Sequence, residues 1–338
     1  MKAGRFGIIG CQHPHIGNFI SGMLKLGYTC AGIYEQENGE LAGKLSETYG
    51  VPLVSDPESL LSSPEVEVIG CASINAEKID VIEWCEKHGK HVMVDKPVVT
   101  TDEGLSRLKG VMDRGRIQIG MLVAGRFSPL LYSLKKRIDA GELGRLLSIT
   151  TRKPHRLHPA SRPAWHFSKE RNGGIIIDLL IHDMDLLRYL TGREISDLEG
   201  FIAKNGFPEY PDFYDSAGVQ VYMEGGIAAQ LYADWYTAGS SWTWGDCRIF
   251  VTGTKGSAEL RLSGDPLIAK EGLLLLVTDT QALHRVVPES PPVTILEDFM
   301  GRLQGHPALQ THEDILKASQ AVIRADRQAK VINRTAPL

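Results

Sequence analysis

Short apolar runs alternate with helical patterns through the first third of the chain. The apolar runs are strand-sized and nearly continuous, as in parallel strands buried on both faces; they cover residues 6–9, 30–34, 66–71, 91–94 and 117–121. Helical spacing lies between them, with Thr101 as a suitable N-cap for the last helix; it covers residues 16–26, 40–49, 76–88 and 102–114. This βαβα order predicts a doubly wound parallel sheet that binds its ligand at the carboxyl ends of its strands.

The pattern changes after residue 122. A helix is predicted to begin at Ser128-Pro129 and to end at Gly141, and another to cover residues 312–330. Consecutive strand-like runs joined by short turns favour a mostly antiparallel sheet; the runs cover residues 146–151, 197–203, 217–223, 227–233, 248–251, 257–262 and 273–278. We therefore predict a Rossmann domain over residues 1–122, and over residues 123–338 an α/β domain with a large, mostly antiparallel open sheet.

A polar stripe runs along an otherwise apolar segment that begins at Gly173-Gly174. Asp178, His182 and Asp185 stand at i, i+4 and i+7, so they share one face of the predicted helix. A helix that is apolar almost all round should be buried, and buried carboxylates and imidazoles need partners. Either the stripe satisfies itself together with a cation, for which Lys96 is a candidate, or it faces a polar pocket that binds a ligand.

Composition and charge narrow the classes of ligand. The chain has 338 residues and a net charge of −4, from 37 basic and 41 acidic residues, so it has no overall field for nucleic acid or an anionic membrane surface. No stretch approaches the roughly 20 apolar residues that span a bilayer, and the N-terminus lacks the pattern of a signal peptide. The five cysteines form no CxxC pair, which indicates reduced thiols in a cytoplasmic protein.

The segment 7–17 stands where a dinucleotide fingerprint belongs, after the first strand and at the start of the first helix. Gly10 supplies the tight turn, whereas Gln12 and His15 occupy the second and third glycine positions. Pro14 would still leave free N–H groups at the positive end of a helix dipole, which suits a phosphate. The alternative is a plain strand–turn–helix with a surface His13-Pro14-His15.

Glu35 ends the second predicted strand, where an acidic side chain hydrogen-bonds a ribose 2′-hydroxyl. Its charge would repel a 2′-phosphate and no arginine follows it in the loop, so we expect NAD rather than NADP. A solvated loop glutamate is the alternative. The full set of residues expected to contact the cofactor is Gly10, Gln12, His13, His15, Glu35, Ala72, Asn75, Lys96 and Pro97.

Several motifs together resemble the glucose-fructose oxidoreductase, inositol dehydrogenase and MocA (Gfo/Idh/MocA) family, and the likeness covers nearly the whole chain. The two specific motifs are the strand and turn Gly89-Lys90-His91-Val92-Met93-Val94-Asp95-Lys96-Pro97, which is similar to GKHVxxEKP, and residues 173–185, which match GGxxxDxxxHxxD. Supporting motifs are Arg126-Phe127-Ser128-Pro129, Gly141-Glu142-Leu143-Gly144, Trp165 ahead of the two glycines, and Gly253-Thr254-Lys255-Gly256. The departures are Asp95 in place of glutamate and the interrupted glycine fingerprint.

The resemblance implies a Rossmann domain followed by an α/β domain, and it places Lys96, Asp178 and His182 on catalytic positions. Oxidation of a secondary alcohol needs a base, a positive group for the developing alkoxide and a nicotinamide beside the C–H bond. We assign the base to His182 and the positive group to Lys96, with Asp178 orienting the substrate or the imidazole. A buried Asp-His-Lys network that only stabilises the fold is the alternative. We predict no metal site, because Asp178 and His182 alone supply only two ligands.

A basic and aromatic segment over residues 152–166 is expected to lie near the helix that carries His182. It could hold a carboxylate, a phosphate or sugar hydroxyls, or could instead be a solvated loop or a subunit contact. The predicted substrate-binding residues are Arg126, His155, Arg156, Trp165, His166, Asp178 and His182.

Three function classes follow from these observations. The first is an NAD-dependent dehydrogenase of a carbohydrate-like small molecule, namely a sugar, polyol or cyclitol. The second is an NAD-dependent glycosidase, in which transient oxidation drives elimination. The third is a nucleotide-sensing protein without turnover, which the interrupted fingerprint favours. We expect a homodimer or homotetramer formed through the sheet of the second domain, and neither nucleic acid nor membrane as a partner.

Overall fold

In a computed structural model, which describes residues 4–332, the chain divides into two units. The first contains the residues up to Val123 together with Val293–Gln320, and the second contains Ala124–Pro292 and the residues from Ala321 onward. The first boundary lies one residue beyond the predicted one. The prediction that everything after residue 122 forms one domain is corrected, because Val293–Gln320 returns to the first unit.

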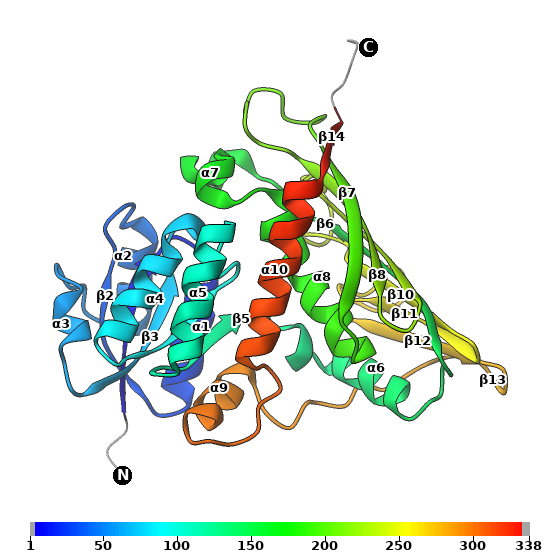
Figure 1. The fold of residues 1–338 in the computed structure, drawn as a ribbon, viewed down its shortest axis with the longest axis horizontal. Helices are drawn as coiled ribbons and strands as arrows, with labels where there is room; N and C mark the ends of the chain where they lie inside the picture. The colour runs from blue at the N-terminus through cyan, green and yellow to red at the C-terminus, as the bar shows by residue number, and fades with distance from the viewer. Residues whose placement is uncertain (1–3, 333–338) are drawn as a thin grey trace. The chain divides into compact units, whose positions relative to one another are not determined.

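The first unit contains a parallel sheet with the strand order β2-β1-β3-β4-β5 (Figure 1). Its strands, which confirm the five predicted runs, are β1 (Arg5–Cys11), β2 (Thr29–Tyr34), β3 (Val66–Ala72), β4 (His91–Asp95) and β5 (Ile119–Leu122). The helical segments between the strands are α1 (His15–Lys25), α2 (Glu40–Tyr49), α3 (Glu58–Leu61), η1 (Asn75–Glu77), α4 (Lys78–Lys87) and α5 (Asp102–Arg114). Thr101 caps α5 as predicted, since its hydroxyl accepts a hydrogen bond of 3.0 Å from Gly104 N–H. The carboxyl ends of the five strands therefore share one edge of the sheet.

Helix α9 (Ile295–Leu303), which our sequence analysis missed, explains why a late segment joins the first unit. Its apolar face enters the core that surrounds α1, where a Cβ at Gly22 would lie only 2.3 Å from Leu296 Cδ1. The helix begins with a capping box, in which Thr294 and Glu297 satisfy each other's backbone N–H groups. That capping box was the available sequence signal.

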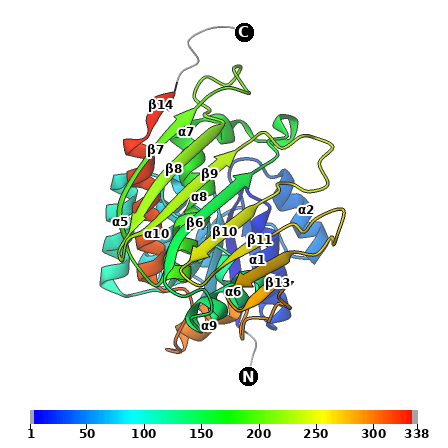
Figure 2. The same cartoon turned by 90° about the vertical axis from the view of Figure 1, so that its right-hand side faces the viewer.

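The second unit is built on a mixed sheet with the strand order β13-β12-β11-β10-β6-β9-β8-β7-β14 (Figure 2). All neighbouring pairs in this order are antiparallel, apart from β6 with β9 and β7 with β14. The strands are β6 (Leu146–Pro154), β7 (Ile195–Ala203), β8 (Ser216–Met223), β9 (Ile227–Asp234), β10 (Arg248–Gly253), β11 (Gly256–Arg261), β12 (Leu273–Thr278), β13 (Gln281–Arg285) and β14 (Lys330–Ile332). The predicted class, a large and mostly antiparallel sheet, is confirmed.

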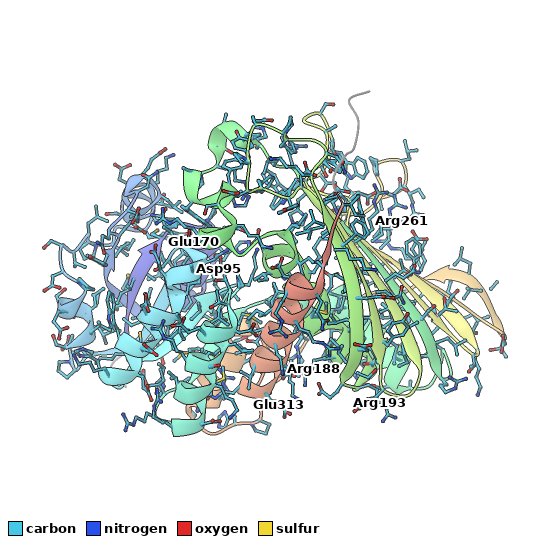
Figure 3. All side chains as sticks on the ribbon, turned by 45° about the horizontal axis from the view of Figure 1, so that its top comes forward. Asp95, Glu170, Arg188, Arg193, Arg261 and Glu313 are labelled. Atoms are coloured by element: carbon cyan, nitrogen blue, oxygen red, sulfur yellow. The ribbon has the colours of Figure 1, made fainter. Side chains whose placement is uncertain are left out.

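Helix α8 (Ile175–Thr191) lies against the sheet and contacts β6, β7, β8 and β9. Its residues are buried except for His182, Arg188, Tyr189 and Thr191, as the apolar pattern predicts. Arg188, labelled in Figure 3, binds the Glu194 carboxylate at 2.7 Å just beyond the C-terminal end of the helix. The other helical segments after residue 123 are η2 (Gly125–Phe127), α6 (Pro129–Asp139), η3 (Pro159–Ser161), η4 (Ala164–Phe167), α7 (Lys169–Asn172) and α10 (His312–Gln328), apart from α9 described above.

Three smaller expectations can be checked against the structure. The last helix ends at Gln328 instead of residue 330, and the chain then continues into the short strand β14. All five cysteines lie within the described residues and are free thiols. Between residues 4 and 332, none of the helices combines the length and the hydropathy that a membrane crossing would need.

Candidate active site

The end of β1 requires glycine at position 10. Gly10 has a φ of +84°, and a Cβ on it would lie 1.8 Å from Ser73 Oγ, at the end of the neighbouring strand β3. The next turn residue is tied to the same strand, because Gln12 N–H donates to the Ala72 carbonyl at 2.8 Å. The backbone thus crosses closely over β3, as the dinucleotide fingerprint requires of its first glycine.

The start of α1 differs from our expectation of free N–H groups. His15 N–H donates to His13 Nδ1 at 3.3 Å, Ile16 N–H to the His13 carbonyl at 3.2 Å, and Gly17 N–H to the Pro14 carbonyl at 3.0 Å. The reason is local, since the turn is tight enough for the side chain and carbonyl of His13 to reach back over the first helical turn. A phosphate bound here has to replace one of these contacts or rely on other donors.

Glu35 is fixed at the end of β2 rather than mobile in solvent. Its carboxylate accepts hydrogen bonds from the backbone N–H groups of Cys11 and Glu37. Both carboxylate oxygens keep a further lone pair for another donor, such as a ribose hydroxyl. Burial and the Glu35 charge together raise the pKa of the Cys11 thiol to about 12, so this cysteine stays protonated and unreactive.

A buried lysine that our sequence analysis missed holds the turn after β4. The ammonium of Lys78 donates to Asn75 Oδ1 at 2.8 Å and to the carbonyls of Asp95 and Lys96 at 3.0 and 3.1 Å. Its side chain is fully buried, and that of Lys96 is nearly so. Lys78 therefore fixes the backbone that presents Lys96, and Asn75, predicted as a cofactor contact, is one of its partners. A lysine in the first turn of an amphipathic helix gives no sequence signal for this role.

The Asp95 carboxylate lies between two histidines of the turn after β1. Oδ2 is 3.1 Å from His13 Nδ1, and Oδ1 is 2.9 Å from His15 Nδ1. Burial alone would raise the pKa of Asp95, but the two imidazoles and Lys78 hold it well below its usual range. The carboxylate is therefore ionised at neutral pH. Figure 3 labels Asp95.

On α8 the polar stripe divides into members with different surroundings. Asp185 forms a bidentate ion pair with Arg126, with Nη2 to Oδ1 at 2.8 Å and Nε to Oδ2 at 3.0 Å. Both side chains are buried, and Arg126 supplies the positive charge that neutralises the Asp185 carboxylate. This pairing gives Arg126 a structural role, and its predicted contact with substrate stays a prediction. Asp178 is buried, whereas His182 is partly exposed.

The basic and aromatic segment forms a packed cluster around Trp235, which we call the Trp235 cluster. It joins His155, Arg162 and His166, whose ring or guanidinium centres lie 5.6, 5.0 and 5.2 Å from the Trp235 ring. Trp165 packs beside His166, and its side chain is also buried. The alternative of a solvated loop therefore does not hold for this segment.

Two further contacts extend the Trp235 cluster. Arg156 donates to the carbonyls of Ser241 and Thr243, at 2.9 and 3.2 Å, and lies 5.9 Å from the Trp244 ring. Burial lowers the pKa of the Arg162 guanidinium and the Asp178 carboxylate opposes this, so electrostatics links the cluster to α8. We did not predict Trp235 or Trp244, because they follow β9, far from the other members in the sequence.

Comparisons with known proteins find a matching family model in each of the two units. Residues 4–119 match the model of an oxidoreductase family with an NAD-binding Rossmann fold, and residues 132–259 match the GFO/IDH/MocA C-terminal domain. Inositol 2-dehydrogenase 2 of Saccharopolyspora erythraea is 28% identical over 273 residues, which are 79% of this chain and 76% of that protein. The scyllo-inositol 2-dehydrogenase (NAD(+)) of Bacillus subtilis is 32% identical over 206 residues, 60% of this chain and 57% of that protein.

A solved structure extends the likeness in fold to almost the full chain. Levoglucosan dehydrogenase, in a complex with NADH and levoglucosan, superposes with a TM-score of 0.82 over 97% of both chains at 19% identity. At that identity the likeness concerns the fold alone.

Proposed function

The chain belongs to the GFO/IDH/MocA oxidoreductase family, and from this premise we propose that it is an NAD-dependent dehydrogenase of a sugar, polyol or cyclitol. The reaction is oxidation of a secondary hydroxyl to a ketone. When bound, NAD supplies the nicotinamide that accepts the hydride. The relatives named above as inositol dehydrogenases support the choice of substrate class.

The observation that carries this proposal is that Asp178 and His182 stand one helical turn apart on the same face of α8. Asp185 is neutralised by Arg126, and Asp183 lies 3.2 Å from the Lys153 ammonium. These pairs give two of the acidic residues a structural purpose. We assign chemistry to Asp178 and His182 because the family resemblance places both on catalytic positions.

We assign the proton transfer to His182. Its imidazole takes the hydroxyl proton of the substrate, and a partly exposed ring can pass that proton on to solvent. Asp178 orients the imidazole or a neighbouring substrate hydroxyl. Lys96 places its ammonium charge beside the oxygen that becomes negative as the proton leaves. The hydrogen bonds from Lys78 to the carbonyls of residues 95 and 96 fix the backbone from which the Lys96 side chain extends.

The residues at the carboxyl ends of β1 and β2 fit a dinucleotide in part. Gly10 permits the close approach of backbone, and Glu35 offers a fixed carboxylate to a ribose. The negative charge of Glu35 disfavours a 2′-phosphate, which supports NAD over NADP. The Trp235 cluster suits a polyhydroxylated ring, because indole faces pack on C–H groups while arginine and histidine donate to hydroxyls.

The test is NAD reduction, followed by absorbance, over a panel of cyclitols, aldoses and linear polyols. We expect His182→Ala to lower kcat by about 10²- to 10⁴-fold, the usual contribution of a positioned base. Lys96→Ala should lower kcat similarly. Matched controls are His306→Ala and Lys109→Ala, which change exposed side chains and should keep full turnover.

Two results would contradict the proposal. Near wild-type turnover in His182→Ala or Lys96→Ala, with folding verified by circular dichroism, would reject the assigned roles. Release of an aglycone without net NADH would instead indicate the glycosidase that our sequence analysis kept as an alternative.

A further inference from the structure

His13, His15 and Asp95 form a cluster to which the proposed dehydrogenase mechanism assigns no proton or hydride transfer, although His13 and His15 are also predicted to contact the cofactor. His13 lies in the turn between β1 and α1, His15 is the first residue of α1, and Asp95 is the last residue of β4. One ligand atom from each side chain lies within 4.8 Å of the other two. The cluster lies at the carboxyl ends of parallel strands, the edge at which such sheets bind ligands.

The electrostatics of the cluster call for a positive charge within it. His13 Nδ1 lies 3.3 Å from the backbone nitrogen of His15 and 3.1 Å from Asp95 Oδ2, so this one ring nitrogen faces both groups. Asp95 Oδ2 lies only 3.1 Å from that nitrogen, is buried, and accepts no hydrogen bond from the described residues. A buried carboxylate oxygen this close to a ring nitrogen is stabilised by a positive charge beside it, which either a metal cation or a proton on the ring can supply.

The neighbouring lysine does not supply this charge directly. The Lys78 ammonium binds the backbone carbonyl of Asp95 and not its carboxylate. The carboxylate thus keeps both oxygens for the histidines, with His15 Nδ1 at 2.9 Å from Oδ1.

Two of the residues that depart from the family motifs belong to this cluster, whereas Gln12, at the second glycine position, does not. His15 stands at the third glycine position of the fingerprint, and Asp95 replaces the glutamate of the strand-and-turn motif.

We propose that His13, His15 and Asp95 bind a divalent transition-metal cation of the zinc class. Two imidazoles and a carboxylate are a donor set that suits zinc, and three protein ligands leave a fourth position open for water or an anionic oxygen. The cation replaces the 3.3 Å contact between His15 N–H and His13 Nδ1, the longest of the contacts within the cluster. From the sequence alone we predicted no metal site, because Asp178 and His182 on α8 supply only two ligands.

The experiment uses tag-free, full-length protein from which metal has been removed by chelation. Zn²⁺ is titrated calorimetrically, and Co²⁺ is titrated in parallel to record its visible ligand-field absorption. We expect one equivalent to bind. His15→Ala and His13→Ala should weaken binding by at least about 100-fold, since even the loss of an outer partner costs 10- to 100-fold. His306→Ala, which removes an exposed histidine elsewhere in the same unit, should bind as the wild type does.

The variants are chosen so that a negative result is informative. Both histidines are partly exposed, so their removal should leave the fold intact, as a circular dichroism spectrum can verify. Asp95→Asn tests the buried ligand in the same titration. The proposal is overturned if no stoichiometric binding occurs, which means that a proton alone joins His13 to Asp95. It is also overturned if His15→Ala retains full affinity, or if bound Co²⁺ shows a thiolate charge-transfer band, which would indicate a cysteine site. These measurements do not depend on dehydrogenase activity.

Discussion

Replacing Asp185 by asparagine removes one charge from the bidentate pair with Arg126 while keeping the shape of the side chain. Asp185 is 1% exposed and Arg126 is 5% exposed, so water cannot solvate the guanidinium that is left behind. Breaking a buried pair in this way typically costs about 3–5 kcal/mol. At about 3 °C per kcal/mol for a unit of this size, the melting temperature should fall by about 9–15 °C.

The assay can report on the second unit specifically. Of the five tryptophans, only Trp84 belongs to the first unit, so intrinsic fluorescence during urea unfolding mainly follows the second. The kcat of folded Asp185→Asn should stay near the wild-type value at low temperature, because we assign this residue to the fold. Asp178→Asn is the matched comparison on the same helix face, and it should lower kcat with a smaller loss of stability.

A compensating double variant separates the pair's net contribution from the cost of an orphaned charge. Arg126→Met combined with Asp185→Leu removes both charges and should recover most of the stability lost in the single variant. The reasoning is refuted if Asp185→Asn costs less than about 1 kcal/mol. It is equally refuted if the folded variant loses as much kcat as Asp178→Asn does.

Three further predictions concern the first unit. NAD should raise the melting temperature more than NADP does, and Glu35→Ala should abolish that difference; equal shifts in the wild type would remove the role given to Glu35. Lys78→Met should destabilise the protein by at least about 2 kcal/mol in urea unfolding, because two backbone carbonyls and Asn75 lose a charged donor. Burial, together with the Arg302 charge, lowers the pKa of His312 to about 4, and its Nε2 accepts Ile119 N–H. The neutral form is favoured on folding, so this contribution is present above pH 6.5 and is lost as the pH falls toward 4. His312→Gln, which can still accept that N–H, should show a weaker dependence of stability on pH across this window; an unchanged dependence would assign the effect to other groups.

Much of the architecture could be read from local patterns. Continuous apolar runs predicted all five strands of the first sheet, because strands buried on both faces cannot alternate with polar residues. The polar stripe of α8 could likewise be read from spacing alone, as could the cap at Thr101. These features depend on residues close together in sequence, where the periods of helices and strands decide which side chains share a face.

Other features depended on contacts between distant segments. The return of α9 to the first unit follows from its packing against Gly22, and the role of Lys78 follows from carbonyls 17 and 18 residues away. The pairing of Arg126 with Asp185 likewise depends on a contact between residues far apart in the sequence. A sequence pattern records that a buried charge needs a partner, whereas only the folded chain selects that partner from several candidates. The reason is that ion pairing and hydrogen bonding act over a few ångströms of space, irrespective of the number of residues between the groups.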